Sequence, residues 1–125
     1  MDFIQAQQHC QLQTGAELDF PFGPDYYVYK VRGKVFAILF SDATQSSINL
    51  KCDPDQAQAL RDLFSAVKPG YHMNKKHWNT VVLDGSVPDN ELQRQIEHSW
   101  QQVVAKLPRL QQKALVIQAS VSPDE

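Results

Sequence analysis

The sequence predicts an α+β domain in which an antiparallel β-sheet, connected as a meander, packs against helices on one face. Three neighbouring segments show the aromatic, β-branched or alternating pattern of strands, and short turns separate them. Two later segments instead repeat apolar residues at helical spacing. The predicted strands of the meander are residues 26–32, 34–40 and 47–52, and the main predicted helices are residues 53–64 and 89–107.

Length and composition indicate a single domain spanning residues 1–125. A chain of 125 residues with 42% hydrophobic and 21% charged residues is typical of one globular unit. Its formal net charge of -2 gives no global attraction to nucleic acid or anionic lipid, so such binding would need a local patch. No apolar run approaches the ~20 residues that span a bilayer, and the start lacks the pattern of a signal peptide. We therefore expect a cytoplasmic protein with no membrane partner, and a monomer rather than an oligomer.

The two cysteines, Cys10 and Cys52, are isolated in the sequence. Their spacing fits neither a disulfide framework nor a metal site. Free cysteine is among the most buried residue types, so we expect two buried thiols.

The first half of the chain is predicted to begin with a helix over residues 2–13, with Gly15 suited to its C-terminal end. The Phe-Pro-Phe-Gly-Pro run at residues 20–24 predicts a rigid turn. Gly33 then provides the turn between the first two strands of the meander. Because strand side chains alternate, Lys30 and Arg32 are expected to share one face.

The third strand shows clean alternation. Ile48, Leu50 and Cys52 are expected to point inward, and the residues expected to point out are Ser47, Asn49 and Lys51.

The second half is predicted to start with a helix capped by Asp53, with Gln56 at the reciprocal position of a capping box. Residues 77–83 predict another strand, and residues 84–86 a turn in which Ser86 caps the next helix. The apolar stripe of that long helix includes Trp100, which we expect to pack against the sheet. Its other members are Leu92, Ile96, Val103 and Leu107, and Pro108 ends the helix.

The tail over residues 109–125 carries a weaker pattern. Leu110, Ala114, Leu115 and Ile117 are compatible with one short docked helix, and the chain is expected to fray from residue 120.

One segment resembles a known family. Residues 69–81 read Pro-Gly-Tyr-His-Met-Asn-Lys-Lys-His-Trp-Asn-Thr-Val, and Leu-Asp-Gly-Ser-Val-Pro-Asp follows at residues 83–89. This order resembles the signature of the MmcQ/YjbR family of small bacterial proteins, with weaker matches from residue 2 to residue 107. The resemblance implies a compact fold similar to that of the frataxin homologue CyaY, described as a double-wing arrangement. It also implies a DNA-binding role.

Basic residues occur in two stretches that contain no carboxylate, residues 26–41 and 66–83. If these stretches converge, their charges could contact phosphates while Tyr29, Tyr71 and Trp78 stack on unpaired bases. The residues predicted to bind nucleic acid are Lys30, Arg32, Lys34, Lys51, His72, Asn74, Lys75, Lys76, His77 and Trp78.

Two alternatives stay open at this point. The charges could form a solvated face with Tyr71 and Trp78 in the core, or the polar residues 71–80 could bind a protein or a small anion. The first alternative assigns these residues no partner, whereas the second, like nucleic-acid binding, describes a non-enzymatic binding module.

Neither a metal site nor a catalytic site is predicted. His72 and His77 are five residues apart, and the acidic residues are scattered, so the iron binding that a CyaY-like fold raises by analogy is not expected. Asp84 or His77 could act as a base, but no nucleophile elbow, phosphate loop or carboxylate pair accompanies them. We therefore expect no cofactor and no enzymatic activity.

Overall fold

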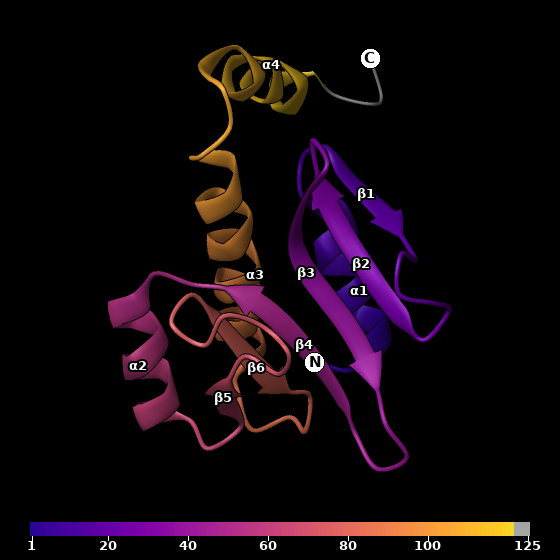
Figure 1. Ribbon diagram of the computed structural model, residues 1–125, viewed down its shortest axis with the longest axis vertical. Helices are drawn as coiled ribbons and strands as arrows, with labels where there is room; N and C mark the ends of the chain where they lie inside the picture. The colour runs from indigo at the N-terminus through magenta and orange to yellow at the C-terminus, as the bar shows by residue number, and fades with distance from the viewer. Residues whose placement is uncertain (122–125) are drawn as a thin grey trace.

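The computed structural model describes residues 1–121, which form one antiparallel sheet with helices against it (Figure 1). The strand order is β1-β2-β3-β4-β6-β5. The predicted fraying from residue 120 falls mostly on residues 122–125, which lie outside the described part. The strands are β1 (Ala16–Asp19), β2 (Tyr26–Val31), β3 (Lys34–Ser41), β4 (Ser46–Lys51), β5 (Val67–Pro69) and β6 (Trp78–Val82), and the helices are α1 (Phe3–Leu12), α2 (Pro54–Leu63), α3 (Asp89–Val104) and α4 (Arg109–Ser120).

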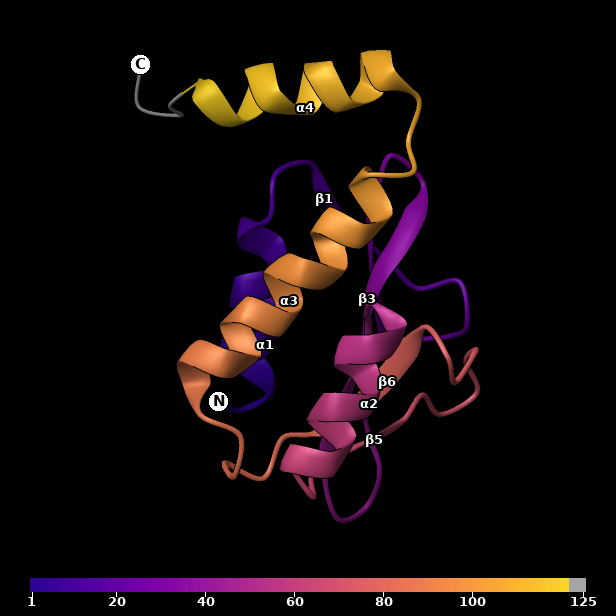
Figure 2. The same cartoon turned by 90° about the vertical axis from the view of Figure 1, so that its left-hand side faces the viewer.

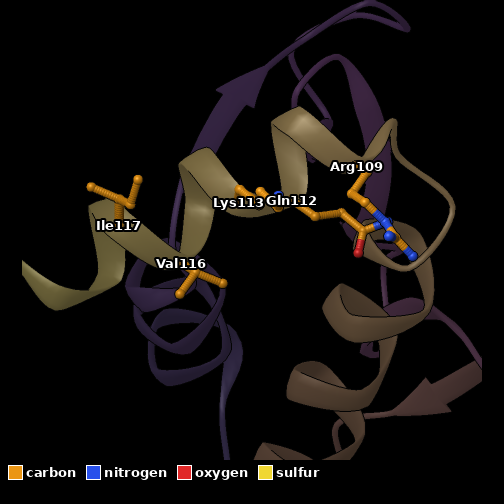
Figure 3. A pocket seen from close by; sticks show the side chains of 5 residues that line it. All are labelled: Arg109, Gln112, Lys113, Val116 and Ile117. Atoms are coloured by element: carbon orange, nitrogen blue, oxygen red, sulfur yellow. The ribbon is translucent and has the colours of Figure 1, made fainter.

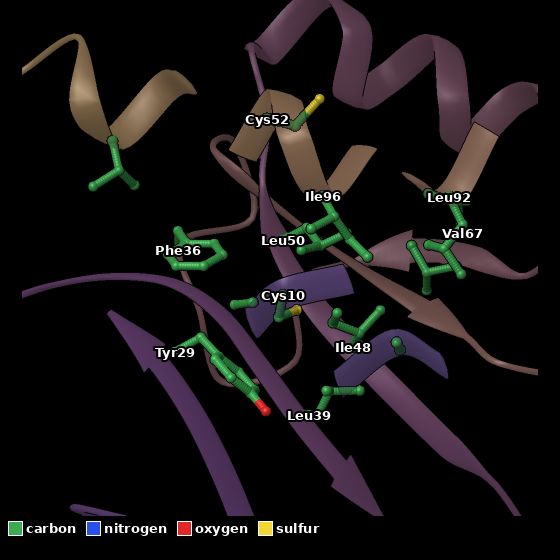
Figure 4. Close-up of a cluster of buried hydrophobic side chains, with 14 of the residues drawn as sticks. Cys10, Tyr29, Phe36, Leu39, Ile48, Leu50, Cys52, Val67, Leu92 and Ile96 are labelled. Carbon is green, nitrogen blue, oxygen red and sulfur yellow. The ribbon is translucent and has the colours of Figure 1, made fainter. Parts of the chain in front are cut away.

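Helices α1 and α3 cover one face of the sheet (Figure 2). Helix α1 contacts β1 and β3, and α3 contacts β2, β3 and β4. The core fills the layer between them and the sheet, where side chains from strands and helices meet (Figure 4). The α+β class, the antiparallel meander and the one-sided helix layer are all confirmed. Fully buried members of this core include Cys10, Tyr29, Phe36, Leu39, Ile48, Leu50, Leu92 and Ile96.

Local sequence explains how the helices begin. The Asp2 carboxylate accepts the Gln5 backbone N–H at 2.8 Å, and the Gln5 side chain accepts the Asp2 N–H at 2.9 Å. Asp53 caps α2 as predicted by accepting the Gln56 N–H. The predicted reciprocal bond is replaced, because the Gln56 side-chain oxygen accepts from Arg94 instead. Capping of this kind satisfies first-turn N–H groups that have no partner within the helix.

Two further expectations need correction. Ser86 does not cap α3, because its hydroxyl donates to Asp84 and the helix begins after Pro88 without a side-chain cap. Arg32 does not share a strand face with Lys30, because it lies in the hairpin turn with φ 51°. Trp100 packs against the core as expected but is only half-buried, and its indole N–H donates to the Thr14 carbonyl oxygen at 2.9 Å.

Strands β1 and β5 are the two elements that the sequence pattern missed. Each is short and forms one edge of the sheet. In β1 the exposed Glu17 and Asp19 interrupt any apolar pattern. In β5 Lys68 and Pro69 are exposed. Both strands exist because a neighbouring strand supplies the hydrogen-bond partners, and a segment of three or four residues does not encode that pairing.

Helix α4 crosses the end of α3 and stands apart from the sheet (Figures 1 and 2). It docks through Leu115, which is 1% exposed. Leu115 packs against Gly15, where an added Cβ would come within 2.8 Å of the leucine side chain. Gly15 also has φ +74°, so a glycine is needed there both for the backbone and for the docking of α4. Within residues 1–121, the helices lack the length and hydropathy that crossing a membrane requires.

Candidate binding site on the helix-free face

The face of the sheet opposite α1 and α3, here called the helix-free face, is defined by the strand register. Phe40 lies opposite Tyr26 on one side and Ser47 on the other. Since neighbours across a sheet point to the same side, these residues share one face. The adjacent row on the same face runs Val28, Ile38, Asn49, Thr80 and Lys68.

A bulge brings Val35 to this face. Tyr29 pairs with Ala37, but Lys30 pairs with Val35, so Phe36 is the extra residue. Val35 and Ile38 are three positions apart and would face opposite ways on a regular strand. The bulge reverses this, so Val35 joins the helix-free face while Phe36 is fully buried in the core.

A loop over residues 70–77, here called the covering loop, folds across part of this face. The Tyr71 N–H donates to the Thr80 hydroxyl oxygen at 2.8 Å, and the Thr80 hydroxyl donates to Asn49 Oδ1 at 2.5 Å. Asn49 Nδ2 then donates to the Tyr71 carbonyl oxygen at 3.1 Å. Ser47 and Asn49 were expected to point out to solvent, and this is wrong: both are about 5% exposed or less. Both side chains point away from α1 and α3 as predicted, but they are buried on the opposite face, which the covering loop partly covers.

The other end of the covering loop is tied to α2. Arg61 Nε donates to Asn79 Oδ1 at 2.7 Å, and its guanidinium also donates to the carbonyl oxygens of Lys75 and Trp78. The Lys75 ammonium donates to the Gly70 carbonyl oxygen at 3.0 Å. These bonds explain why residues 70–80 are so polar: many of their polar groups are used to hold the covering loop in place.

Gly70 lets the covering loop approach β6. A Cβ on this residue would lie 2.7 Å from Trp78 Cβ and 2.9 Å from the Trp78 carbonyl oxygen. The Gly70 N–H donates to that same carbonyl at 2.9 Å. Only glycine therefore allows the backbone to pass this close without displacement.

Aromatic rings form a row along the helix-free face, called here the aromatic row. The ring centroids of Tyr26 and Phe40 are 5.9 Å apart, and those of Phe40 and Tyr71 are 6.0 Å apart in a stacked arrangement. His72 lies 4.0 Å from Tyr71 and has a left-handed backbone with φ 56°. Tyr26 is 37% exposed and Tyr71 53% exposed, so the row presents rings to solvent.

Two hollows flank the aromatic row, and Tyr26, Phe40 and Tyr71 line both. The more apolar one, here called the aromatic hollow, has a volume of about 410 Å³. The second has a volume of about 420 Å³ and is more polar, with Asp42, Ser47 and Lys68 among its residues. The residues lining the aromatic hollow are Phe22, Tyr26, Val35, Ile38, Phe40, Asn49, Tyr71, His72 and Met73.

The predicted basic residues fall into three groups. Lys30 and Lys51 lie on the helix-free face, where Lys51 is opposite Trp78. Arg32 and Lys34 lie at the hairpin turn. Lys34 pairs with the core residue Val31, so the register does not place Arg32 and Lys34 on the helix-free face. The remaining predicted residues are in or beside the covering loop: His72, Asn74, Lys75 and Lys76 are exposed, and His77 is half-buried.

Charge pairing modifies this basic set. The Lys30 ammonium lies 2.9 Å from the Asp19 carboxylate, and this hydrogen bond holds the pKa of Asp19 below its usual value. Burial, with a contribution from nearby Lys106, lowers the pKa of Lys51. Asn74 is also engaged, because its side-chain oxygen accepts the Lys76 N–H at 3.0 Å. Lys68 and Lys76 are exposed, and no ion pair involves them within residues 1–121.

Of the three aromatic residues predicted to stack on bases, only Tyr71 presents most of its ring to solvent. Tyr71 is exposed in the aromatic row. Tyr29 cannot stack on a base, because it is 2% exposed and belongs to the core on the helix side. Trp78 is half-buried beneath the covering loop. Tyr26 and Phe40 were missed as site residues, although the alternation of residues 26–31 would have separated Tyr26 from Tyr27 and Tyr29.

Another depression, of about 470 Å³, lies on α4 (Figure 3). It is shallow, and its side chains all come from the single helix, including Val116 and Ile117, which are 71% and 65% exposed. Within residues 1–121, no three His, Cys, Asp or Glu side chains are grouped so that they could hold a metal ion. The helix-free face is therefore the candidate site.

The fold and the site describe a class of protein. It is an α+β domain with a six-stranded antiparallel sheet, and the covering loop, which carries the sequence motif, lies over part of the helix-free face. The YjbR family model matches residues 13–102, and the chain belongs to the YjbR family. The motif from residue 69 to residue 89, by which the sequence resembles this family, forms the covering loop, β6 and the turn before α3.

Comparison with individual proteins gives the same family. The chain is similar to the uncharacterised protein YjbR of Escherichia coli K12, with 35% identity over 116 residues, 93% of this chain and 98% of that protein. It is 39% identical over 97 residues to the uncharacterised protein YbdF of Escherichia coli O157:H7, covering 78% of this chain and 80% of that protein. The crystal structure of Deinococcus radiodurans protein DR2400, with domain DUF419, superimposes with a TM-score of 0.84 at 30% identity, covering 99% of this chain and 94% of that one.

Proposed function

We propose that this protein is a binding module for single-stranded nucleic acid and that the bound strand lies across the helix-free face. The observation that carries the proposal is the aromatic row, in which Tyr26 and Tyr71 present ring surface to solvent on either side of Phe40. Bases stack on such rings with little dependence on sequence, and each stacked base contributes about 1–3 kcal/mol.

Lysines supply the contacts for phosphate. Lys51 and Lys68 are on the same face as the aromatic row by register, and Lys76 is exposed on the covering loop beside it. Local positive charge of this kind is what a protein with net charge -2 needs to attract a polyanion. The DNA-binding role implied by the family resemblance agrees with this arrangement.

Single strands are favoured over duplexes because the rings need accessible base faces. In a duplex those faces are stacked inside the helix, and a protein reaches only base edges in the grooves. The helix-free face carries no exposed helix that could enter a major groove, among residues 1–121. Asn74 and Lys75 are used to hold the covering loop. The module therefore binds through base stacking and charge more than through hydrogen bonds to base edges.

The test is fluorescence anisotropy with labelled oligonucleotides of about 12 nucleotides, within the usual site size of such modules. The double variant Tyr26→Ala, Tyr71→Ala is expected to weaken single-strand binding at least about tenfold. Ile117→Ala removes an apolar side chain on α4 that is more exposed than either tyrosine, and it is expected to change nothing. Lys68→Glu with Lys76→Glu is expected to abolish binding, and Lys113→Glu on α4 is the charge control.

Salt dependence gives a second measure. With about three to four phosphate contacts, the slope of log K against log salt for a single strand should be about -2 to -3. Absence of binding to single strands at ~100 μM protein and low salt would overturn the proposal, because non-specific binders usually reach that range. Equal binding of duplex, unaffected by the tyrosine substitutions, would replace it with a purely electrostatic surface.

A protein or small-anion partner for residues 71–80 is the other candidate, and the observation in its favour is the exposed Lys76 and His72 on the covering loop. Inorganic phosphate distinguishes it, since an anion site saturates with phosphate and gains little from a longer strand.

We further propose that the module acts as a monomer in the cytoplasm. Cys10 and Cys52 are both free and buried, as expected of a protein from a reducing compartment. Fractionation of cells that express a tagged protein, with sizing of the purified chain, tests both statements.

A further inference from the structure

We infer that the aromatic hollow is a pocket for one planar heteroaromatic ring that carries a hydrogen-bond acceptor, the class of ring to which nucleobases belong. This inference deepens the function proposed above and rests on it, because the ring would belong either to a nucleic-acid strand or to a free nucleotide. The hollow lies beside the aromatic row, so a base inserted there is flanked by bases stacked on the row.

The size and lining of the hollow fit a ring. Its volume of about 410 Å³ lies in the lower part of the range of small-molecule sites. Val35 and Ile38 form an aliphatic floor from β3, and Tyr26, Phe40 and Tyr71 supply aromatic walls. Apolar floors with aromatic sides bind flat rings through dispersion and offset stacking.

The β2–β3 bulge is what creates this floor. Without the extra residue Phe36, Val35 would point to the core and the hollow would lose one side. A bulge costs a regular ladder hydrogen bond, and such bulges commonly re-aim a side chain at a functional site.

The wall formed by the covering loop is already in place before any ligand binds. Thr80 and Asn49 each make one hydrogen bond to the Tyr71 backbone and a third to each other, and Arg61 holds the far end of the loop. His72 also lines the hollow and has φ 56°, a backbone conformation that non-glycine residues keep only where the surroundings impose it. A preformed wall reduces the ordering cost of binding.

Asn49 provides a hydrogen-bond donor. Its amide nitrogen carries two hydrogens, and one is donated to the Tyr71 carbonyl oxygen. The residue is 4% exposed and lines the hollow, so a ring acceptor is the natural partner for the second hydrogen. A pocket built to donate in this way discriminates against rings that lack an acceptor, because the donor would then be left unpaired.

Lys30 does not line the hollow, but it is the strand neighbour of Val35, which does, and so brings a positive charge close to it. It lies directly opposite Val35 across the β2–β3 pair, and its ammonium is 2.9 Å from the partly exposed Asp19 carboxylate. Exposed ion pairs are weak, so an anionic group attached to the bound ring can compete for this lysine. The pocket therefore favours a nucleotide over a nucleoside, and a nucleoside over a purely hydrocarbon ring.

The test is a methyl-detected NMR titration of the whole protein with adenosine, adenosine 5′-monophosphate, toluene and inorganic phosphate. Adenosine and its monophosphate are expected to shift the methyl signals of Val35, Ile38 and Met73, with tighter binding of the monophosphate. Val35→Trp fills the hollow without removing any hydrogen bond and is expected to abolish these shifts. Val35→Ala is the matched control and is expected to retain them.

The outcomes separate this inference from the proposed function. Ring binding without oligonucleotide binding would keep the pocket and overturn the proposed function. Oligonucleotide binding that Val35→Trp leaves unchanged, with no methyl shifts from the rings, would overturn the pocket alone. Methyl shifts from toluene equal to those from adenosine would overturn the requirement for an acceptor, and shifts from phosphate alone would reduce the site to an anion site. Each comparison uses the same folded protein, verified by the remaining methyl signals.

Discussion

Thr80 and Asn49 face each other across β6 and β4, and the threonine hydroxyl donates to Asn49 Oδ1 at 2.5 Å. The same hydroxyl accepts the Tyr71 N–H, and Asn49 donates to the Tyr71 carbonyl. This pair therefore fixes both backbone groups of one aromatic residue over the helix-free face. It links the sheet register to the geometry of the candidate site.

Thr80→Val tests that link. The substitution keeps the shape but removes the donor to Asn49 and the acceptor for Tyr71, leaving buried polar groups unpaired. We expect a loss of about 1–3 kcal/mol in the free energy of unfolding, measured by urea denaturation. Thr44→Val, in an exposed turn where Thr44 bonds to Asp42, is the control and should cost much less. An equal effect of both variants would mean that the buried network contributes nothing special.

Gly70→Ala should destabilise the protein through a steric clash. The new methyl group would lie 2.7 Å from Trp78 Cβ, and the covering loop would have to lift from β6. Overpacking of this kind typically costs about 1–3 kcal/mol. Gly85→Ala is a useful comparison, since apart from Gly85 and its chain neighbours no atom of residues 1–121 lies within 4 Å of the new methyl group and only the φ of +83° opposes the change, at a cost of roughly 1–2 kcal/mol. The two differ in a second readout: Gly70→Ala should also weaken ligand binding, and Gly85→Ala should not.

His98 should make stability depend on pH. Its Nε2 accepts the Asp53 N–H at 3.2 Å, so the ring must be neutral there, and burial followed by the nearby Arg94 lowers its pKa. A histidine with a lowered folded-state pKa takes up its proton more readily when unfolded. Stability is therefore full above the unfolded pKa of about 6.5 and is lost as the pH falls through the folded value. His98→Gln keeps an acceptor without titrating, so the difference between its pH profile and that of the wild type should be confined to this acidic window. Identical profiles would contradict the assignment.

The two thiols should be unreactive in the native state. Burial raises the pKa of Cys10 to about 12 and that of Cys52 to about 11, so almost no thiolate exists near neutral pH. Alkylation without reductant should give no adduct on the folded protein and two adducts in denaturant, counted by mass spectrometry. Failure to label the denatured chain would indicate a disulfide instead of two free thiols.

Trp100→Phe should cost less than the loss of a fully buried stripe residue. The indole is half-buried, and the change removes its hydrogen bond to the Thr14 carbonyl, a loss of about 1 kcal/mol. Ile96→Ala, at a fully buried position of the same helix, should cost about 2–5 kcal/mol. Thermal or urea unfolding of the two variants compares these values, and a larger loss for Trp100→Phe would place the ring deeper in the core than its exposure indicates.

The sequence by itself determined the elements whose signals are local. Alternation and apolar runs predicted β2, β3 and β4 to within about a residue, and Asp53 marked the start of α2. The apolar stripe around Ile96 identified α3, and the resemblance from Pro69 onward identified the family. Each of these signals depends on the chemistry of a few consecutive residues, which fold the same way wherever the segment is placed.

Only the tertiary structure decided how the helix-free face is used. Alternation showed that Asn49 leaves the helix side, but not that the covering loop buries it through Thr80. Strands β1 and β5 exist through pairing with neighbours, and the bulge at Phe36 is a property of two strands together. Tyr26 and Tyr71 are 45 positions apart in the numbered sequence and still belong to one aromatic row. Such contacts depend on register and loop closure between distant segments, and no pattern within either segment encodes them.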